Sequence, residues 1–263
     1  TNGNFLSLNG VWDFKWYETL ESRDLDFFRI DYETSGWATM PVPGIWELNG
    51  YGDPLYLNIG YPWRTWHKSV PPIVPTMRNS AGQYRRTFTI DDSWKGKDIF
   101  LHIGSATSNV RVWVNGKHVG YSEDSKLEAR FDLTEYVKSG ENLIALEIFR
   151  WCDGTYLEDQ DKWRMSGIFR EVYLLFREKT HIRDFFAKCD LSDDFPKADF
   201  TVDLSLTGAA EVGYKLICPC GETVEEGKTS VNGEGKITFA TISDPKLWSD
   251  EIPNLYTLVL TCG

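Results

Sequence analysis

The sequence has 263 residues, of which 41% are hydrophobic and 25% are charged, and this composition indicates a soluble globular protein rather than a disordered chain. No stretch approaches the roughly 20 consecutive apolar residues that a membrane-spanning helix needs. The formal net charge of -11 argues against a nucleic-acid partner, because binding phosphates requires a clustered basic surface.

The length favours two domains, although one large all-β unit would also fit. Aromatic residues account for 14% of the chain and include 11 tryptophans. Indole rings stack on the apolar C–H faces of sugars, and they also fill large β cores. For any single tryptophan we expect core packing rather than a sugar contact.

The first half of the chain is predicted to form a series of short β-strands. Their side chains alternate between apolar and polar, and many are β-branched or aromatic. Asn115 and Gly116 interrupt one such run and both tolerate positive φ, so a hairpin with a type I′ turn is expected there. The clearest strands cover residues 84–90, 99–103, 110–114, 142–149 and 171–176.

One short connecting helix is predicted at residues 132–139. Asp132 can cap the first free amides, Glu135 follows three residues later, and Gly140 can end the helix in a left-handed conformation. Long amphipathic helices are not indicated anywhere. The fold class is therefore expected to be all-β, with antiparallel sandwiches rather than a parallel α/β sheet.

From about Lys179 the strand patterns become shorter and aromatic residues rarer, which predicts a second, smaller β-sandwich. This segment is shorter than the ~100 residues of an immunoglobulin-like domain. Its last strands are therefore expected to be missing. The expected strands cover residues 201–206, 212–218, 236–240 and 255–260.

The five cysteines are odd in number and irregularly spaced, so we expect reduced thiols rather than a disulfide framework. The Cys218-Pro219-Cys220 segment is too tight for the usual metal or redox CxxC pattern and has no companion pair. A metal site is not expected there. The sequence begins without Met and without an apolar signal segment, which leaves a cytoplasmic or periplasmic location open.

No nucleophile-elbow, zinc-protease, phosphate-loop or dinucleotide motif occurs in the sequence. The densest acidic run is EDQD at residues 158–161, and it allows three interpretations. It could hold an acid and base for glycosyl transfer. It could supply carboxylates to a cation or to sugar hydroxyls. It could also be a solvated loop whose acids pair with Lys162 and Arg164.

The stretch RWCDGTYLEDQD at residues 150–161, continued by KWRMSGIFREV at residues 162–172, closely resembles a signature of family 2 glycoside hydrolases, in particular of their β-galactosidases. Further segments follow in the order typical of that family. They include LNGVW at 8–12, GDPLYLNIGYP at 52–62, WVNG at 113–116 and PKLWS at 245–249.

The resemblance implies a jelly-roll sugar-binding domain at residues 1–178 and an immunoglobulin-like β-sandwich at residues 179–263, incomplete at its C-terminus. The catalytic glutamates and the magnesium ligands of that family belong to a TIM barrel expected to follow. No catalytic residue is therefore expected in this chain, which should be inactive alone. The missing catalytic domains and a galactoside or other carbohydrate would be its partners, and the parent would be a homo-oligomer.

Two site residues follow from the resemblance. Asp161 corresponds to a carboxylate that contacts galactosyl hydroxyls and helps to hold a sodium ion, and Asn58 corresponds to an amide that reaches the same sugar. A loop-stabilising Asn and a salt-bridged Asp are the simpler interpretations. Two other functions stay open: the same family acting on a β-glucuronide or β-mannoside, and a stand-alone carbohydrate-binding module. The LEDQD run at 157–161 favours the galactosidase branch.

Overall fold

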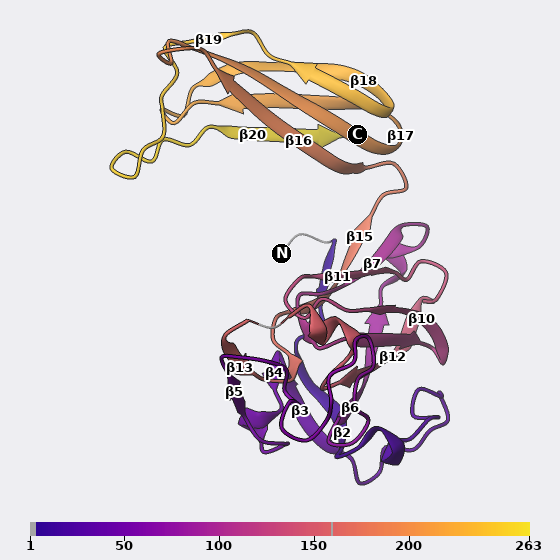
Figure 1. The fold of residues 1–263 in the computed structure, drawn as a ribbon. Coiled ribbons are helices and arrows are strands. Elements are labelled where there is room, and N and C mark those ends of the chain that lie inside the picture. The colour runs from indigo at the N-terminus through magenta and orange to yellow at the C-terminus, as the bar shows by residue number, and fades with distance from the viewer. Residues whose placement is uncertain (1–3, 159) are drawn as a thin grey trace. The chain divides into compact units, whose positions relative to one another are not determined.

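The computed structural model describes residues 4–158 and 160–263, and the chain divides into two compact units, one ending at Phe176 and the other comprising Arg177–Gly263 (Figure 1). Strands make up nearly all of the regular structure. Short 3-10 turns are the only helical elements in these residues: η1 (Leu20–Ser22), η2 (Glu47–Asn49), η3 (Asp92–Trp94) and η4 (Asp153–Tyr156). The expected all-β fold is confirmed. No helix of the described residues is long and apolar enough to span a bilayer.

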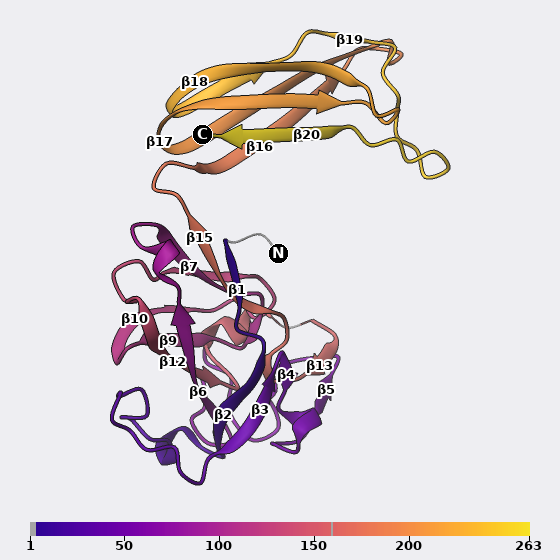
Figure 2. The same ribbon diagram turned by 180° about the vertical axis from the view of Figure 1, so that it is seen from behind.

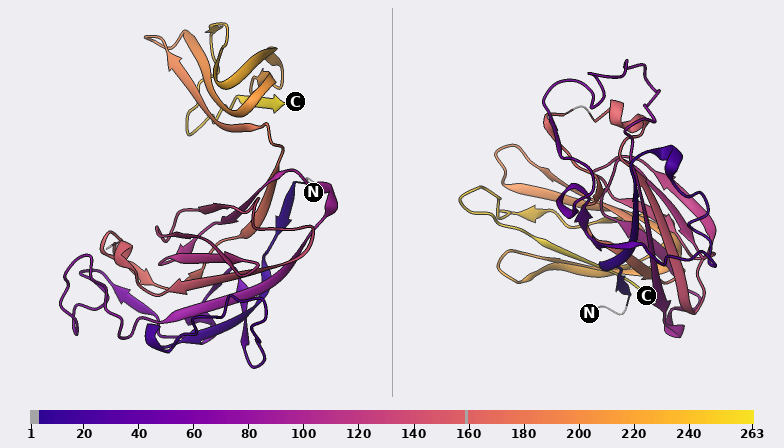
Figure 3. Two further views of the ribbon diagram at one scale, coloured as in Figure 1. Left: turned by 90° about the vertical axis from the view of Figure 1, so that its right-hand side faces the viewer. Right: turned by 90° about the horizontal axis from the view of Figure 1, so that it is seen from below.

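The first unit is a sandwich of two main antiparallel sheets whose strands curve around a shared core (Figures 2 and 3). The six-stranded sheet has the order β10 (Lys117–Ser122), β9 (Val110–Val114), β12 (Gly140–Phe149), β6 (Ala81–Ile90), β2 (Gly10–Tyr17) and β3 (Ala38–Val42). The four-stranded sheet has the order β1 (Phe5–Ser7), β15 (Val172–Arg177), β7 (Asp98–Ile103) and β11 (Ala129–Asp132).

Two small sheets complete this unit. One joins β4 (Gly44–Ile45), β14 (Gly167–Ile168) and β8 (Ala106–Thr107). The other is a two-stranded ribbon of β5 (Leu55–Leu57) and β13 (Lys162–Arg164). The five strands predicted in the first half of the sequence are all present, as β6, β7, β9, β12 and β15.

Tryptophans fill much of the core between the sheets. Trp12 and Trp46 are each only 1% exposed. The indole of Trp12 donates to the Leu8 carbonyl at 2.9 Å, and that of Trp46 donates to the Tyr84 hydroxyl. Gly82 allows Trp46 to approach the backbone of β6, since a Cβ at this position would lie 2.2 Å from the indole. Core packing thus explains most tryptophans, and among those in the described residues only Trp163 and Trp248 are exposed.

The predicted hairpin is confirmed and the predicted helix is wrong. Val114 pairs with Lys117, and Asn115 and Gly116 have φ of 50° and 79°. Asp132 ends strand β11, and residues 133–139 form turns and irregular structure instead of a helix. The Asn142 side chain accepts from the Lys138 amide at 2.9 Å and donates to the Lys138 carbonyl at 2.7 Å. The first bond satisfies the Lys138 amide, which a helix would have paired internally, and the second satisfies a carbonyl that would lie in the last turn of such a helix.

The second unit is built on three long strands, β16 (Ile182–Leu191), β17 (Lys197–Ile217) and β18 (Thr223–Thr238), with β19 (Ile242–Ser243) and β20 (Thr257–Cys262) paired to β17. Two strands predicted separately, at 201–206 and 212–218, belong to the single strand β17. Its pairing with β18 shifts register between Ser205 and Ala209. The expectation of short strands was therefore wrong here. The unit has its own apolar core, centred on residues such as Val202, Leu204 and Val212.

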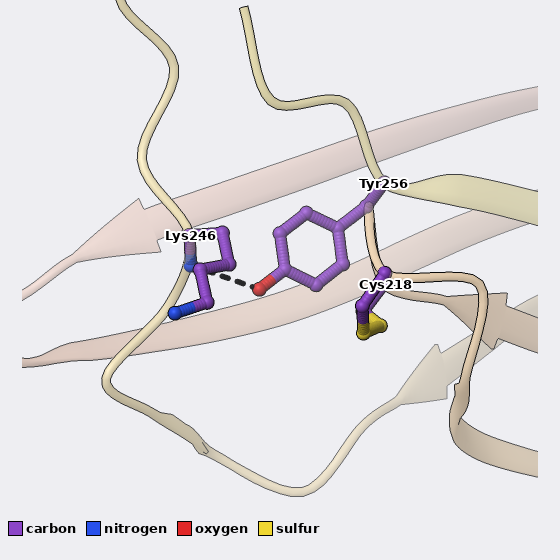
Figure 4. The surroundings of a disulfide bond; sticks show 4 residues. Cys218, Lys246 and Tyr256 are labelled. Atoms are coloured by element: carbon purple, nitrogen blue, oxygen red, sulfur yellow. Dashed lines mark hydrogen bonds between the residues drawn. A yellow bond between two sulfur atoms is a disulfide. The ribbon is translucent and has the colours of Figure 1, made fainter. Parts of the chain in front are cut away.

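Cys218 and Cys220 form a disulfide bond, with Cα atoms 5.2 Å apart (Figure 4). The expectation of reduced thiols was wrong for this pair. The Gly221 amide donates to the Cys218 carbonyl at 2.9 Å, so the chain makes a tight turn that brings the two sulfurs together. The remaining cysteines, Cys152, Cys189 and Cys262, are free.

Candidate carbohydrate-binding site

Asn58 and Asp161 lie at one end of the β5–β13 ribbon. The ribbon's register pairs Leu57 with Lys162, and Asn58 and Asp161 are the next residues on the two strands. Residues that continue an antiparallel register lie opposite each other. The register therefore places the ends of β5 and β13, two strands far apart in the sequence, side by side (Figure 1), and Asn58 and Asp161 continue the chain from these ends.

The register puts the exposed side chains of Tyr56 and Trp163 on one face of the ribbon, and continuing its alternation by one residue assigns Asn58 and Asp161 to the same face. Every second residue of a strand points to the same side, and the register pairs Tyr56 with Trp163 one step inward from Asn58 and Asp161. The intervening strand residues are all partly buried. We call this surface the ribbon face, and it consists of Tyr56, Asn58, Asp161 and Trp163.

The Asp161 carboxylate is held by a hydrogen bond within this face. The Tyr56 hydroxyl donates to Asp161 Oδ1 at 2.6 Å. This hydrogen bond, together with the negative charge of Asp161, raises the pKa of Tyr56. The phenol therefore stays protonated and remains a donor at neutral pH, which fixes one carboxylate oxygen and leaves the other available as an acceptor.

The two aromatic side chains of the ribbon face are exposed although they contact each other. Tyr56 is 51% and Trp163 is 58% exposed, and their ring centroids are 5.5 Å apart. Large aromatic rings usually lie in the core or in an interface. An exposed aromatic pair beside a carboxylate and an amide is thus a typical composition for a sugar-contacting surface.

Hydrogen bonds and an ion pair hold Glu158 and Gln160, in the loop before β13, against the rest of the first unit. Glu158 accepts from the Ser125 amide at 2.9 Å and lies 3.7 Å from Lys162 Nζ. Arg164 donates to the main-chain carbonyls of Glu158 and Gln160. The simple interpretation, a loop acid paired with Lys162, therefore applies to Glu158, whereas the described hydrogen bond of Asp161 is to Tyr56.

A small cavity of about 20 Å³ lies behind the loop, lined by residues that include Ser125, Lys126, Glu158 and Lys162. Burial, together with the neighbouring positive charge of Lys162, lowers the pKa of Lys126 to about 8. Its ammonium lies 3.9 Å from the centroid of the Phe169 ring and donates to the Thr107 hydroxyl at 3.1 Å. These contacts join the loop that carries Lys126 to strand β8 and to Phe169.

One group of potential metal ligands occurs among the described residues, and it does not include Asp161. Ligand atoms of Glu123, Cys152 and Asp153 lie within 4.8 Å of one another. Burial raises the pKa of the Cys152 thiol to about 11 and also raises the pKa of Glu123. The thiol is therefore protonated at neutral pH, which disfavours it as a metal ligand.

The sequence analysis missed Tyr56 and Trp163. Both belong to segments quoted for the family resemblance, but neither was singled out. Alternation alone could have identified them, since each lies two residues along the chain from a candidate. What the sequence could not supply was the pairing of β5 with β13, which places all four on one face.

Two family models match the chain. Residues 5–178 match "Glycosyl hydrolases family 2, sugar binding domain" and residues 180–262 match "Glycosyl hydrolases family 2". The chain is 38% identical to a β-galactosidase of Priestia megaterium over 269 aligned positions and 36% identical to one of Streptococcus thermophilus over 258. These alignments cover 98% and 97% of this chain but 26% and 25% of the relatives, so the chain spans about a quarter of their length.

Solved structures share the fold. A β-glucuronidase of Bacteroides uniformis superposes with a TM-score of 0.78 at 19% identity, covering 98% of this chain and 30% of that one. A Bifidobacterium dentium β-glucuronidase gives a TM-score of 0.74 at 18% identity, with 100% of this chain and 46% of that one covered. At this level of identity the similarity establishes the arrangement of strands, and no more.

Proposed function

Because the chain belongs to glycosyl hydrolase family 2, we propose that it is the non-catalytic N-terminal part of a retaining β-galactosidase and forms one wall of the galactose subsite. Retention requires a nucleophile and a second group that acts first as acid and then as base. In our proposal both groups belong to other domains of a longer polypeptide, where magnesium would also bind. The curated β-galactosidases, about four times longer than this chain, support that division.

The observation that carries the proposal is the juxtaposition of Asn58 and Asp161 at the end of the ribbon. A pyranose presents neighbouring hydroxyl groups that need both acceptors and donors. A carboxylate supplies acceptors, and an amide supplies one acceptor and two donors. The two side chains together can bind and orient a sugar, which lowers the entropy cost of the reaction without supplying a proton or a nucleophile.

The end of the ribbon offers some, but not all, of the oxygen ligands that a sodium ion needs. Hard cations prefer oxygen ligands, and Asp161 Oδ2, the Tyr56 hydroxyl and the Asn58 carbonyl are all oxygen atoms. Asp161 is exposed, and a cation held here would need further ligands. We propose that Asp161 supplies one ligand of a sodium site shared with the sugar and with other domains of the parent enzyme.

A hydrolysis screen tests the proposed activity. Residues 1–263 and a full-length parent enzyme would be assayed on nitrophenyl β-galactoside, β-glucuronide and β-mannoside. We expect turnover only by the longer protein, and on the galactoside. Preference for the glucuronide or mannoside would keep the family and overturn the substrate. Hydrolysis by residues 1–263 would overturn the division of labour, and a parent without hydrolase domains would indicate a carbohydrate-binding module.

Replacement of Asp161 tests the site itself. In the parent enzyme, Asp161→Asn should reduce kcat/KM for the galactoside by at least tenfold, since it removes a charged hydrogen-bond partner worth about 1.5–3 kcal/mol. The same change should weaken the activation by sodium. Asp190→Asn, on the exposed strand β16 of the second unit, is the matched control. An unchanged rate and an unchanged sodium response would contradict the assignment of Asp161.

A further inference from the structure

The turn that carries Cys218 and Cys220 joins the two longest strands of the second unit. Strand β17 ends at Ile217 and β18 begins at Thr223, and these two residues are the last pair of their ladder. One residue separates the two cysteines, which share a disulfide bond. The proposed sugar subsite belongs to the first unit, so it does not account for this bond.

Main-chain hydrogen bonds hold this turn independently of the sulfur atoms. The Cys218 amide donates to the Glu222 carbonyl, and the Gly221 amide donates to the Cys218 carbonyl, both at 2.9 Å. Gly221 has a φ of 87°, which glycine adopts without steric cost, and the ring of Pro219 fixes a further φ. The turn should therefore keep its shape when the disulfide is reduced, with the two thiols close enough to pair again.

The second unit does not depend on this bond for its fold. In the chain-entropy model the stabilisation by a disulfide grows with the length of the loop that it closes, and this one joins residues only two positions apart. The buried apolar residues that form the core of the unit include neither cysteine. We therefore expect the unit to stay folded when both thiols are reduced.

The two sulfur atoms differ in their access to solvent. Cys220 is exposed, whereas Cys218 is half-buried, and the half-buried Tyr256 lies in the surroundings of the bond (Figure 4). The rate of thiol–disulfide exchange depends on access to the attacked sulfur, and exposed disulfides are the more easily exchanged ones. An incoming thiolate should therefore attack Cys220, and Cys218 is then the leaving group.

We infer that the Cys218–Cys220 turn is a thiol–disulfide exchange site for small thiols, in which Cys220 is the attacked sulfur and the second unit stays folded throughout. This inference is independent of the proposed function, since it concerns the second unit alone.

The exchange proceeds in two steps. A small thiolate forms a mixed disulfide with Cys220 and releases Cys218 as a thiolate, which takes up a proton. A second small thiolate then attacks the sulfur of the first, which releases a small disulfide and the Cys220 thiolate, and this also takes up a proton. Two small thiols thereby lose the two electrons that reduce the protein bond, and a small disulfide reverses both steps.

Reduction in the folded state is the first test. The 263-residue chain is treated with dithiothreitol without urea, alkylated with iodoacetamide and digested with trypsin. Residues 216–228 form a tryptic peptide that contains Cys218 and Cys220 and no other cysteine. We expect mass spectrometry to find two alkyl groups on this peptide after reduction and none before it. Far-ultraviolet circular dichroism should be retained, and oxidised glutathione should restore the bond once the reductant is removed.

Single-cysteine variants identify the attacked sulfur. Cys218→Ala leaves the exposed Cys220 and should form a mixed disulfide with oxidised glutathione about tenfold faster than Cys220→Ala, which leaves the half-buried Cys218. The reduced wild type should not accumulate this adduct on the turn, because the neighbouring thiol displaces the glutathione. Cys189, an exposed free thiol, is the matched control and should carry the adduct in all three proteins.

Three results would overturn the inference. Alkylation of the peptide only at urea concentrations that unfold the second unit would show a bond that exchange does not reach in the folded chain. Equal rates for the two variants, or a faster reaction of Cys220→Ala, would contradict Cys220 as the attacked sulfur. Accumulation of the glutathione adduct on the turn of the wild type would show that the turn does not hold the two thiols together.

Discussion

Lys126 shows how the region behind the ribbon affects the ionisation of single residues. Its pKa is lowered to about 8, mainly by burial and then by the positive charge of Lys162. Between pH 8 and the ordinary value of 10.5, the folded protein therefore binds fewer protons than the unfolded chain. Stability rises with pH wherever the unfolded state binds more protons.

We predict that Lys126 makes the protein more stable as pH increases from about 8 to 10.5. The gain should be about 1–2 kcal/mol, because partial exposure to solvent reduces the full effect. Urea unfolding of the wild type and of Lys126→Met at both ends of this range measures it. The difference between the two proteins should change with pH, whereas Lys95→Met, at an exposed site, should behave like the wild type. A pH-independent difference for Lys126→Met would contradict the prediction.

Among single residues, the sequence identified some candidates and missed others. Asn58 and Asp161 followed from a resemblance to a known family, and their roles stay predictions. The Cys218–Cys220 disulfide was missed because an odd, irregular set of cysteines gives no pairing signal. The bond depends on the tight turn at Gly221, a feature of backbone geometry that spacing alone does not determine.

The disulfide of this turn closes a very short loop, so its effect on the unfolded chain is small. In the chain-entropy model, stabilisation grows with loop length. We predict that replacing Cys218 and Cys220 together by Ser lowers the free energy of unfolding by about 1–2 kcal/mol. Urea unfolding measures this change, with Cys189→Ser, at an exposed free thiol, as the control. Titration of the unfolded, unreduced chain should give three reactive thiols, and five would contradict the bond.

At the level of secondary structure, strands were predicted correctly where turn-forming residues mark their ends. The hairpin of β9 and β10 was found because Asn115 and Gly116 mark its turn. The sequence analysis predicted two strands in the region of β17 and left Thr207 and Gly208 between them. In the structure both residues lie within β17, at the point where its pairing with β18 shifts register. The prediction of a helix at 132–139 was wrong, and the side chain of Asn142, outside the segment, binds the amide and the carbonyl of Lys138 instead. Local sequence patterns thus predict secondary structure correctly except where contacts with distant residues bind the same main-chain groups.

Strand β20 has one open edge in the described structure. It pairs with β17 alone, and the Gly263 amide donates toward β17 at the Glu211 carbonyl. Since alternate amides of a strand point to the same side, those of Leu258, Leu260 and Cys262 point to the open side. The strand contains no charge, proline or register shift, which are the usual protections of a sheet edge.

We predict that the 263-residue chain self-associates through this edge. Leu260→Pro removes an outward amide without breaking the ladder to β17 and should give a monomer. Leu260→Ala loses similar packing, keeps the amide and should still associate. Sedimentation velocity over a range of concentrations measures both, and circular dichroism checks the fold. A wild type that stays monomeric, or a Leu260→Pro variant that associates equally well, would contradict the prediction.

At the scale of the whole molecule, each unit has a core of its own. The core of the first unit combines residues from both of its main sheets, and that of the second unit shares no residue with it. A segment with its own core and few connections can fold alone. The all-β class and the family were evident from the sequence. The sequence predicted a change of domain at about Lys179, and the contacts of the structure divide the described chain after Phe176.

We predict that residues 4–176 fold in isolation. The expected result is a cooperative urea transition and a near-ultraviolet circular dichroism spectrum with the sharp bands of immobilised tryptophans such as Trp12 and Trp46. Residues 177–263 prepared separately serve as the comparison, since that unit contains only one tryptophan, Trp248. Loss of the near-ultraviolet bands with retained far-ultraviolet signal would contradict independent folding.

The alternation in the β5–β13 ribbon also constrains how this part of the sequence can change in length. Inserting one residue into Leu55–Leu57 or Lys162–Arg164 would slip the register and turn every following side chain to the opposite face. Tyr56 and Trp163 would then point inward, and a half-buried leucine or a basic side chain would take their place. Insertions and deletions in this ribbon should therefore be tolerated in steps of two residues, and a length difference of one should mark a relative in which these side chains no longer share this face.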